Sequence, residues 1–393
     1  MNKSRLGSID VLRALVMFFM VFVNDLWTIK GVPVWLEHAP GPADAMGFSD
    51  IIFPAFLFIV GLSIPFAIKN RIARGQSRGE IFKHILLRAL ALIVMGFFHV
   101  NMESYSDAAV LPEAVWKILI TLGFFLIWLE YKDDKIKKYK TWLQGTGILL
   151  LVLMAFLYKG NSSDGLVWMK PHWWGILGLI SWAYVLCASI ILWGGEKINI
   201  IIGSLLFFIF FNAAAQLGWI DFLSPFTKYG ILDLGNTSNS TLVMAGVLIA
   251  VIYRKQPASF SKLITGLFGI AVLLFLFGFI TRPLWGISKI RATPSWTTIC
   301  AGISILAFAI LIYIVDKKGK QNWFEIIKPA GTSTLTCYLL PYFHEAIFIS
   351  LLGWRLPLFL RTGAIGIIKC LLFALIIVLI TGWLEKRKIR LRI

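Results

Sequence analysis

Charged residues are scarce in this chain. Only 15% of its 393 residues are Asp, Glu, Lys or Arg, whereas 58% are hydrophobic, and the mean hydropathy is +0.80. A soluble domain is roughly 25% charged and 45–50% apolar. The composition therefore excludes an ordinary soluble domain and indicates a polytopic membrane protein.

Paired cysteines and the common catalytic motifs are also missing. No C-x-x-C pair, Walker loop or H-E-x-x-H motif occurs, which argues against a zinc site, a P-loop nucleotide hydrolase and a zinc protease. We predict buried free thiols, no disulfide and no metal site. The four cysteines all lie in apolar segments: Cys187, Cys300, Cys337 and Cys370.

Acidic residues are outnumbered by basic ones, 20 to 38, which gives a formal net charge of +18. The basic residues cluster in alternate loops between apolar segments, for example in 69–83, 132–140 and 386–392. This is the pattern of the positive-inside rule, and no nucleic-acid motif opposes it, so we expect no nucleic-acid partner. The rule predicts that both termini are cytoplasmic.

A bilayer core of about 30 Å needs roughly 20 apolar residues per helix. The sequence predicts an all-α, polytopic membrane helix bundle of about twelve transmembrane helices, as a single domain over residues 1–393. The first segment is expected to be an uncleaved helix, and the short segment 239–253 to be partly buried in protein or tilted. The approximate spans are 10–28, 49–69, 83–102, 112–131, 142–158, 174–194, 198–219, 239–253, 262–281, 296–315, 333–352 and 363–384.

The loop between the first two segments concentrates residues that can carry chemistry. It contains His38, whose imidazole can take a proton near neutral pH. Asn24 and Asp25 end the first helix, and Asp50 opens the second. We expect these four residues to form one patch at the outer membrane face. Taken alone, a loop histidine and an acid in a first helical turn are also ordinary structural features.

Two further charged groups lie within apolar segments, where charge is costly. Asp10 and Arg13 lie at i and i+3 near the inner face, either as a structural ion pair or as contacts for a charged ligand. His344 and Glu345 follow the helix-breaking Pro341, and this pair is expected to face protein or water, where it could line a cavity.

One predicted outer loop, residues 282–295, departs from the charge rule because it holds two arginines and a lysine. This loop is either a chance exception to the positive-inside rule or a polar loop that folds back and contacts an anion or a substrate.

The stretch RLGSIDVLRALVMFFMVFVND, a histidine loop and then SDIIFPAFLFIVGLSI resemble the lysosomal heparan-α-glucosaminide N-acetyltransferase family and its bacterial relatives. Ala14 stands where that family has glycine, and GNTSNSTLVMAGVLIA and GTSTLTCYLLPYFHE are looser similarities. The matching positions are Arg5, Ser8, Asp10, Arg13, Met20, Asn24, His38, Asp50, Phe53, Pro54, Phe56, Phe58 and Gly61.

The resemblance implies acetyl transfer across a membrane, from cytoplasmic acetyl-CoA as cosubstrate to an extracytoplasmic amino sugar or glycan. It places the catalytic histidine on His38 and a helix-end asparagine, the expected oxyanion donor, on Asn24. It also implies a homodimer in membrane lipid, and we expect the bacterial inner membrane. The expected acceptor contacts are Asp50, Asp25, His344 and Glu345, and the expected CoA contacts are Arg13, Asp10 and Arg5.

Two questions stay open at this stage. His38 could act as a general base in direct transfer or carry the acetyl group as an acetyl-histidine. A transporter or flippase for a glycan or lipid-linked sugar is the alternative function, and twelve helices with cytoplasmic termini also suit that class.

Overall fold

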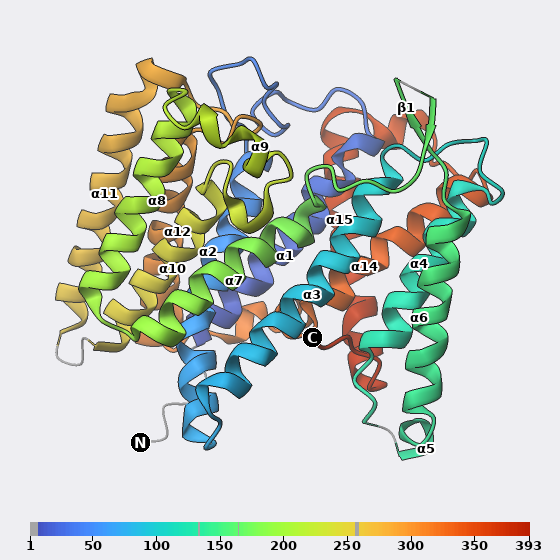
Figure 1. Cartoon of the computed structure of the whole chain (residues 1–393), viewed down its shortest axis with the longest axis horizontal. Helices are drawn as coiled ribbons and strands as arrows, with labels where there is room; N and C mark the ends of the chain where they lie inside the picture. The colour runs from blue at the N-terminus through green and yellow to red at the C-terminus, as the bar shows by residue number, and fades with distance from the viewer. Residues whose placement is uncertain (1–6, 133, 164, 256–258) are drawn as a thin grey trace. The chain divides into compact units, whose positions relative to one another are not determined.

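The computed structural model describes residues 7–132, 134–163, 165–255 and 259–393, and these are largely helical (Figure 1). The main helices are α1 (Gly7–Asp25), α2 (Ser49–Ala73), α3 (Arg78–Met102), α4 (Glu113–Trp128), α6 (Lys140–Leu157), α7 (Gly175–Gly194), α8 (Ile198–Gln216), α10 (Ser238–Lys255), α11 (Phe260–Trp285), α12 (Pro294–Leu311), α14 (Thr334–His344) and α15 (Gly363–Lys386). Two π-helices, η4 (Ile312–Lys317) and η6 (Glu345–Leu351), continue α12 and α14.

Shorter elements connect these helices. They are η1 (Leu26–Thr28), α5 (Asp134–Lys137), η2 (Asp221–Leu223), α9 (Ser224–Thr227), η3 (Ile231–Asp233), η5 (Asn322–Phe324), α13 (Lys328–Thr332) and η7 (Leu358–Arg361). One antiparallel hairpin joins β1 (Gly160–Ser162) to β2 (Gly165–Val167), with Gly160 opposite Val167.

Each of the twelve predicted segments falls on one of the main helices, with boundaries that differ by a few residues. Eight described helices are long and apolar enough to cross a membrane. The chain is therefore an integral membrane protein with a helical bundle fold, as predicted. Twelve crossings and cytoplasmic termini stay predictions.

The chain divides into two compact units, each of which is built from discontinuous stretches of sequence. Unit 1 comprises Met1–Val16, Pro33–Leu92 and Ile176–Asn322, and unit 2 comprises Met17–Val32, Ile93–Gly175 and Trp323–Ile393. The division falls within α1 and α3. That residues 1–393 act as a single domain stays a prediction.

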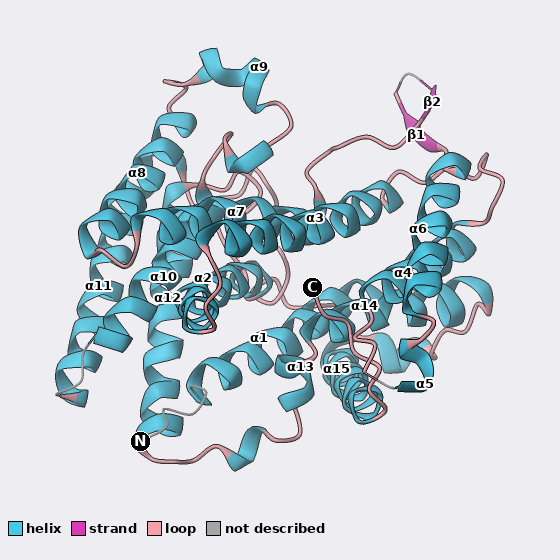
Figure 2. Cartoon of the chain, turned by 60° about the horizontal axis from the view of Figure 1, so that its bottom comes forward, coloured by secondary structure: helices cyan, strands magenta, loops and turns pink. Residues whose placement is uncertain are grey.

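Unit 1 is organised around α10. This helix packs against α2, α8 and α12, and α11 covers the other side of α12 (Figures 1 and 2). All residues from Ser238 to Val251 are buried. The expectation that the short segment 239–253 is buried in protein is therefore confirmed. A helix surrounded by neighbours does not need a full bilayer-length apolar surface.

The contact between α2 and α10 depends on two glycines. A Cβ atom built on Gly61 would overlap the carbonyl oxygen of Val243, and one on Gly246 would overlap that of Phe58. Small residues of this kind let two membrane helices approach to backbone contact. This close crossing fixes the direction of α2, whose first turn carries Asp50.

In unit 2, α4 packs against α6, α14 and η6, and α15 packs against α13 and α14. Helix α4 ends at Trp128, so the predicted end near residue 131 was too late. After the helix, the chain forms a bridge between Leu129 and Leu391 near the C-terminus.

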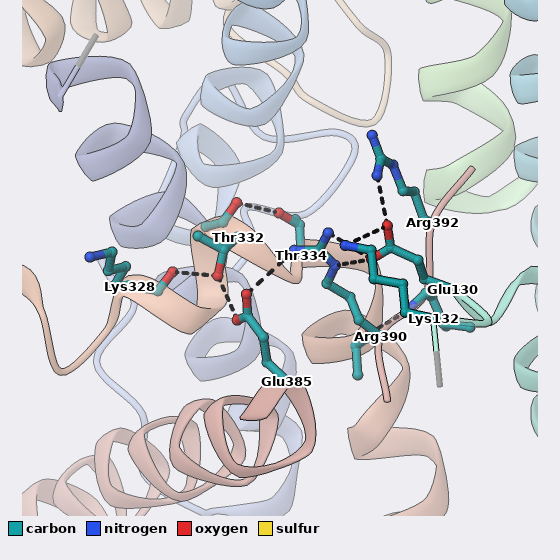
Figure 3. A network of polar contacts seen from close by, with 11 residues as sticks. Glu130, Lys132, Lys328, Thr332, Thr334, Glu385, Arg390 and Arg392 are labelled. Atoms are coloured by element: carbon teal, nitrogen blue, oxygen red, sulfur yellow. Dashed lines mark hydrogen bonds and ion pairs between the residues drawn. The ribbon is translucent and has the colours of Figure 1, made fainter. Parts of the chain in front are cut away.

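A network of ionic contacts surrounds this bridge (Figure 3). The Glu130 carboxylate accepts bonds of 2.8 Å from Arg390, 2.7 Å from Arg392 and 3.0 Å from Lys132. Partial burial by itself raises the pKa of Glu130, but hydrogen bonds from Arg392 and Lys132 and the charge of Arg390 lower that pKa to about 2. The last residues of the chain are thereby attached to the end of α4.

We predict that Gly61→Ala lowers the thermal unfolding temperature in detergent, because the new methyl group enters occupied backbone space; such overpacking costs about 1–3 kcal/mol. Gly203→Ala in α8 is the matched control, since a Cβ there meets nothing within 4 Å. That control should be neutral or slightly stabilising. Equal midpoints for the two variants would contradict the close crossing.

We also predict acid sensitivity through Glu130. A carboxylate with a depressed folded-state pKa stabilises the fold above its unfolded pKa of about 4.3, and this contribution is lost as the pH falls toward 2. Glu130→Gln should lower the unfolding temperature at pH 7 and flatten its decline between about pH 5 and pH 3. The exposed Glu325, paired only at the surface with Lys328, provides the control Glu325→Gln. A Glu130→Gln profile parallel to wild type would refute this assignment.

Candidate functional site

The loop before α2 is closed at its base by backbone contacts. The N–H of Phe48 donates to the Trp35 carbonyl at 2.7 Å, and the Ser49 hydroxyl donates to the Leu36 carbonyl at 2.6 Å. Gly47 lies so close to the Glu37 carbonyl that any larger residue would clash there. Residues 37–47 therefore project from a fixed base.

The Asp50 side chain holds the inside of this loop. Its Oδ2 accepts backbone N–H groups from Ala39 at 2.9 Å and Gly47 at 3.0 Å, and its Oδ1 lies 2.7 Å from Nδ1 of His38. The Asp50 side chain is only 1% exposed, whereas that of His38 is 47% exposed. One buried carboxylate thus connects the start of α2 to an accessible imidazole.

This geometry selects one form of His38. Asp50 already accepts two N–H groups, as an ionised carboxylate does, so the 2.7 Å contact is made by a proton on Nδ1 of His38. In the neutral ring the other nitrogen, Nε2, then carries the lone pair. A histidine held in this way can accept a proton from a substrate, with Asp50 stabilising the charge that forms.

The basic loop between α11 and α12 folds back onto the histidine loop, at the same end of unit 1 (Figure 1). Asp44 accepts the N–H of Ile287 at 2.6 Å and Nε of Arg282 at 2.8 Å. These two hydrogen bonds, first that from Ile287, lower the pKa of Asp44 below its usual value. The loop therefore folds back, as one of the two alternatives predicted, and its contact with an anion or a substrate stays a prediction.

The same loop brings Lys289 to the imidazole. Its Nζ lies 3.2 Å from Nδ1 of His38 and 3.9 Å from Oδ1 of Asp50. The Lys289 side chain is 24% exposed, and burial lowers the pKa of its amine, whereas the charge of Asp50 opposes that shift. The site in unit 1 is therefore a triad of His38, Asp50 and Lys289.

Asn24 and Asp25 belong to unit 2, so the predicted patch that joins them to His38 and Asp50 stays a prediction. Asn24 is exposed at the end of α1. Asp25 is buried, and its carboxylate accepts a bond of 2.6 Å from Nζ of Lys369, which also donates to the hydroxyl of Thr28 at 2.8 Å.

His344 and Glu345 lie in the same polar region of unit 2. The His344 ring packs against Phe373, with centroids 4.7 Å apart, and lies within electrostatic reach of Asp25 and Lys369. Glu345 accepts a bond of 2.9 Å from Lys117, a buried lysine of α4. The structure therefore brings together three residues that we predicted as acceptor contacts: Asp25, His344 and Glu345.

The residues that we predicted to contact CoA lie elsewhere in unit 1. Arg13 donates to Asp10 at 2.9 Å and to the Ser63 hydroxyl of α2 at 3.0 Å. The ion pair expected from the i, i+3 spacing is confirmed, and the ligand contact is untested by this geometry. Arg5 lies outside the described residues.

Sequence reasoning missed Lys117 and Lys369, and it noticed Lys289 only as one of the basic residues of the loop 282–295. The first two are charges inside apolar segments, and that signal alone could have identified them. Lys289 lay in the unusual basic loop, but nothing local showed that it reaches a histidine 251 positions away.

Comparison with known proteins relates the chain to one family. The family described as a domain of unknown function (DUF5009) matches residues 5–227. Human heparan-alpha-glucosaminide N-acetyltransferase is 34% identical over 98 residues, and the mouse protein of the same name is 32% identical over 101 residues. Each match covers 25% of this chain and only 14% of the relative. The resemblance to this group of membrane acyltransferases is confirmed.

We predict that Asp50→Asn loosens the histidine loop, because the amide offers one acceptor oxygen where the carboxylate offers two. Backbone amides between residues 39 and 47 should exchange hydrogen roughly 5- to 150-fold faster, as expected when a buried hydrogen bond worth about 1–3 kcal/mol is lost. Asp221→Asn, at an exposed aspartate of unit 1, is the control. Unchanged exchange in Asp50→Asn would show that the carboxylate does not hold the loop.

Proposed function

Because the chain belongs to the DUF5009 family, which matches residues 5–227, we propose that it is a transmembrane acetyltransferase. In this proposal, the acetyl group passes from cytoplasmic acetyl-CoA to an extracytoplasmic amino sugar or glycan. The partial identity to two N-acetyltransferases supports acetyl transfer in general. The protein would work in the bacterial inner membrane, as a homodimer, with the His38 loop on the outer side.

One observation carries this proposal: the imidazole of His38 has its Nδ1 bound to a buried carboxylate and its ring accessible. Such an arrangement suits a general base, which contributes typically about 10²–10⁴-fold to a rate. A structural loop histidine would not need a carboxylate that is itself held by two backbone N–H groups.

The chemical step follows from this geometry. Nε2 of His38 accepts a proton from the acceptor amine or hydroxyl while the nitrogen or oxygen of that group attacks the thioester carbonyl carbon. The tetrahedral intermediate then breaks its C–S bond, and the CoA sulfur leaves and receives the proton. Asn24 would donate to the developing oxyanion; a donor of this kind is worth about 10²–10³-fold. An acetyl-His38 intermediate is the second route: Nε2 itself attacks the thioester carbonyl carbon, the C–S bond breaks and CoA leaves as its thiolate. The acceptor then takes the acetyl group from Nε2 and gives up its proton.

Donor binding is proposed for the opposite end of α1. Arg13 would contact CoA phosphates, with Asp10 and Ser63 orienting its guanidinium and Arg5 adding positive charge. Arg side chains suit this role because their planar fork matches phosphate oxygens. CoA is polyanionic and does not cross hydrocarbon, so this proposal has its acetyl-bearing arm thread between helices.

Acceptor contacts are proposed for the polar region of unit 2. Asp25, His344 and Glu345 carry the hydrogen-bonding groups that a sugar requires, and Lys369 and Lys117 fix the two carboxylates. Charged side chains that are paired in this way are tolerated within apolar helices. Asp50 would act through His38 rather than on the acceptor.

We predict that His38→Ala lowers acetyl transfer at least about 10²-fold, the contribution of a positioned base. The assay uses labelled acetyl-CoA and a panel of amino sugars with purified protein. The same variant should keep the increase in unfolding temperature that acetyl-CoA produces, because binding to the native state stabilises it by mass action. His172→Ala, at another exposed histidine, is the control.

Two results would contradict the proposal. Full activity in His38→Ala would exclude His38 as the general base. The absence of any stabilisation of the wild type by acetyl-CoA, together with sugar flux in vesicles, would instead support a transporter or flippase.

A further inference from the structure

We propose that Lys289 is a positioning residue that acts through His38, because its positive charge beside the imidazole opposes protonation of the ring. The inference rests on the proposed function for its catalytic meaning, but not for its test. It concerns a residue from a loop 251 positions away in sequence, which the mechanism above does not use.

The first support is distance. Nζ of Lys289 lies 3.2 Å from Nδ1 of His38, closer than its 3.9 Å approach to Oδ1 of Asp50. Asp50 already receives the Nδ1 proton and two backbone N–H groups. The ammonium group therefore faces the imidazole as a neighbouring charge rather than as the main partner of the carboxylate.

The second support is the way in which the loop is held. On one side, the N–H of Ala45 donates to the Ile287 carbonyl at 3.0 Å, and the Ser288 hydroxyl donates to the Gly41 carbonyl at 3.2 Å. On the other side, Gln216 of α8 donates to the Arg291 carbonyl at 2.8 Å. Lys289 lies between these attachments, so its approach to His38 is built into the backbone.

Backbone conformation adds to this restraint. Gly286, at the end of α11, has a φ of 70°, and a Cβ there would lie 3.2 Å from Oδ1 of Asp44. Ala292 has a φ of 49°, a left-handed conformation that non-glycine residues adopt at a cost. The loop is thus strained near its end and requires its contacts to persist.

The electrostatic consequence follows from the charges around His38. A positive charge within about 4–6 Å disfavours protonation of a group by about 1–3 pH units, and a negative charge favours it. Asp50 alone would favour the imidazolium, which cannot accept a proton. Lys289 opposes Asp50, so its charge favours the form of the ring that can act as a base.

The described residues place a few other charged or titratable groups near this pair. Cys300 of α12 faces Lys289. The ion pair between Asp44 and Arg282 connects the histidine loop to α11. Arg291 donates to the Gly41 carbonyl at 3.2 Å. The opposite charges of Asp44 and Arg282 offset each other, so Lys289 is the positive charge that faces the Asp50 carboxylate at the ring.

The test follows the protonation of His38 directly. In protein labelled with ¹⁵N-histidine, the imidazole signal missing from His38→Ala identifies this residue among the five histidines. Lys289→Met and Lys289→Gln should raise its titration midpoint by about one pH unit. Lys289→Arg, which keeps the charge, should leave the midpoint unchanged, as should Lys159→Met at an exposed lysine.

Unchanged midpoints in both neutral variants would overturn the inference, and so would an equal shift in Lys289→Arg, which would indicate altered packing instead of lost charge. In acetyl transfer, the acid limb of the kcat/KM profile should move to higher pH by the same amount. If the wild type transfers no acetyl group, the proposed function fails, while the titration still decides the role of Lys289.

Discussion

The interaction on which the site depends is the burial of one carboxylate, Asp50, at the start of α2. A buried charge is tolerable only when it is paired and hydrogen-bonded. Asp50 meets this condition with two backbone N–H groups and the ring of His38. All three donors come from the preceding loop. The hydrogen bonds that stabilise the buried carboxylate therefore also hold the loop in its fold and orient the imidazole.

The same constraint appears in unit 2, with side chains in place of backbone donors. Asp25 is buried against Lys369, and the buried Lys117 is neutralised by Glu345. Replacing either member alone would leave an uncompensated charge, which is far more costly than removing the pair. Placing charged side chains within apolar helices costs desolvation free energy, and this cost is the physical reason to connect these residues with function.

The helices were largely predictable from sequence, because a run of about 20 apolar residues has few alternatives to a membrane helix. The boundaries were less certain: α4 ends at Trp128, since Glu130 pairs with the C-terminal arginines. The pairing of His38 with Asp50 was also foreseeable, because the two residues lie 12 positions apart at the two ends of one loop. The pairing of Arg13 with Asp10 followed from helical spacing alone.

The sequence by itself therefore determined the membrane class, the positions of the helices and the local polar pairs, since each depends on residues near one another in the chain. Tertiary structure alone decided that Lys369 meets Asp25 and that Lys289 meets His38. These contacts join segments separated by hundreds of residues, and they depend on how close two helices can approach. That approach is set by packing, for example at Gly61 and Gly246, and no local pattern encodes which partner lies across the contact.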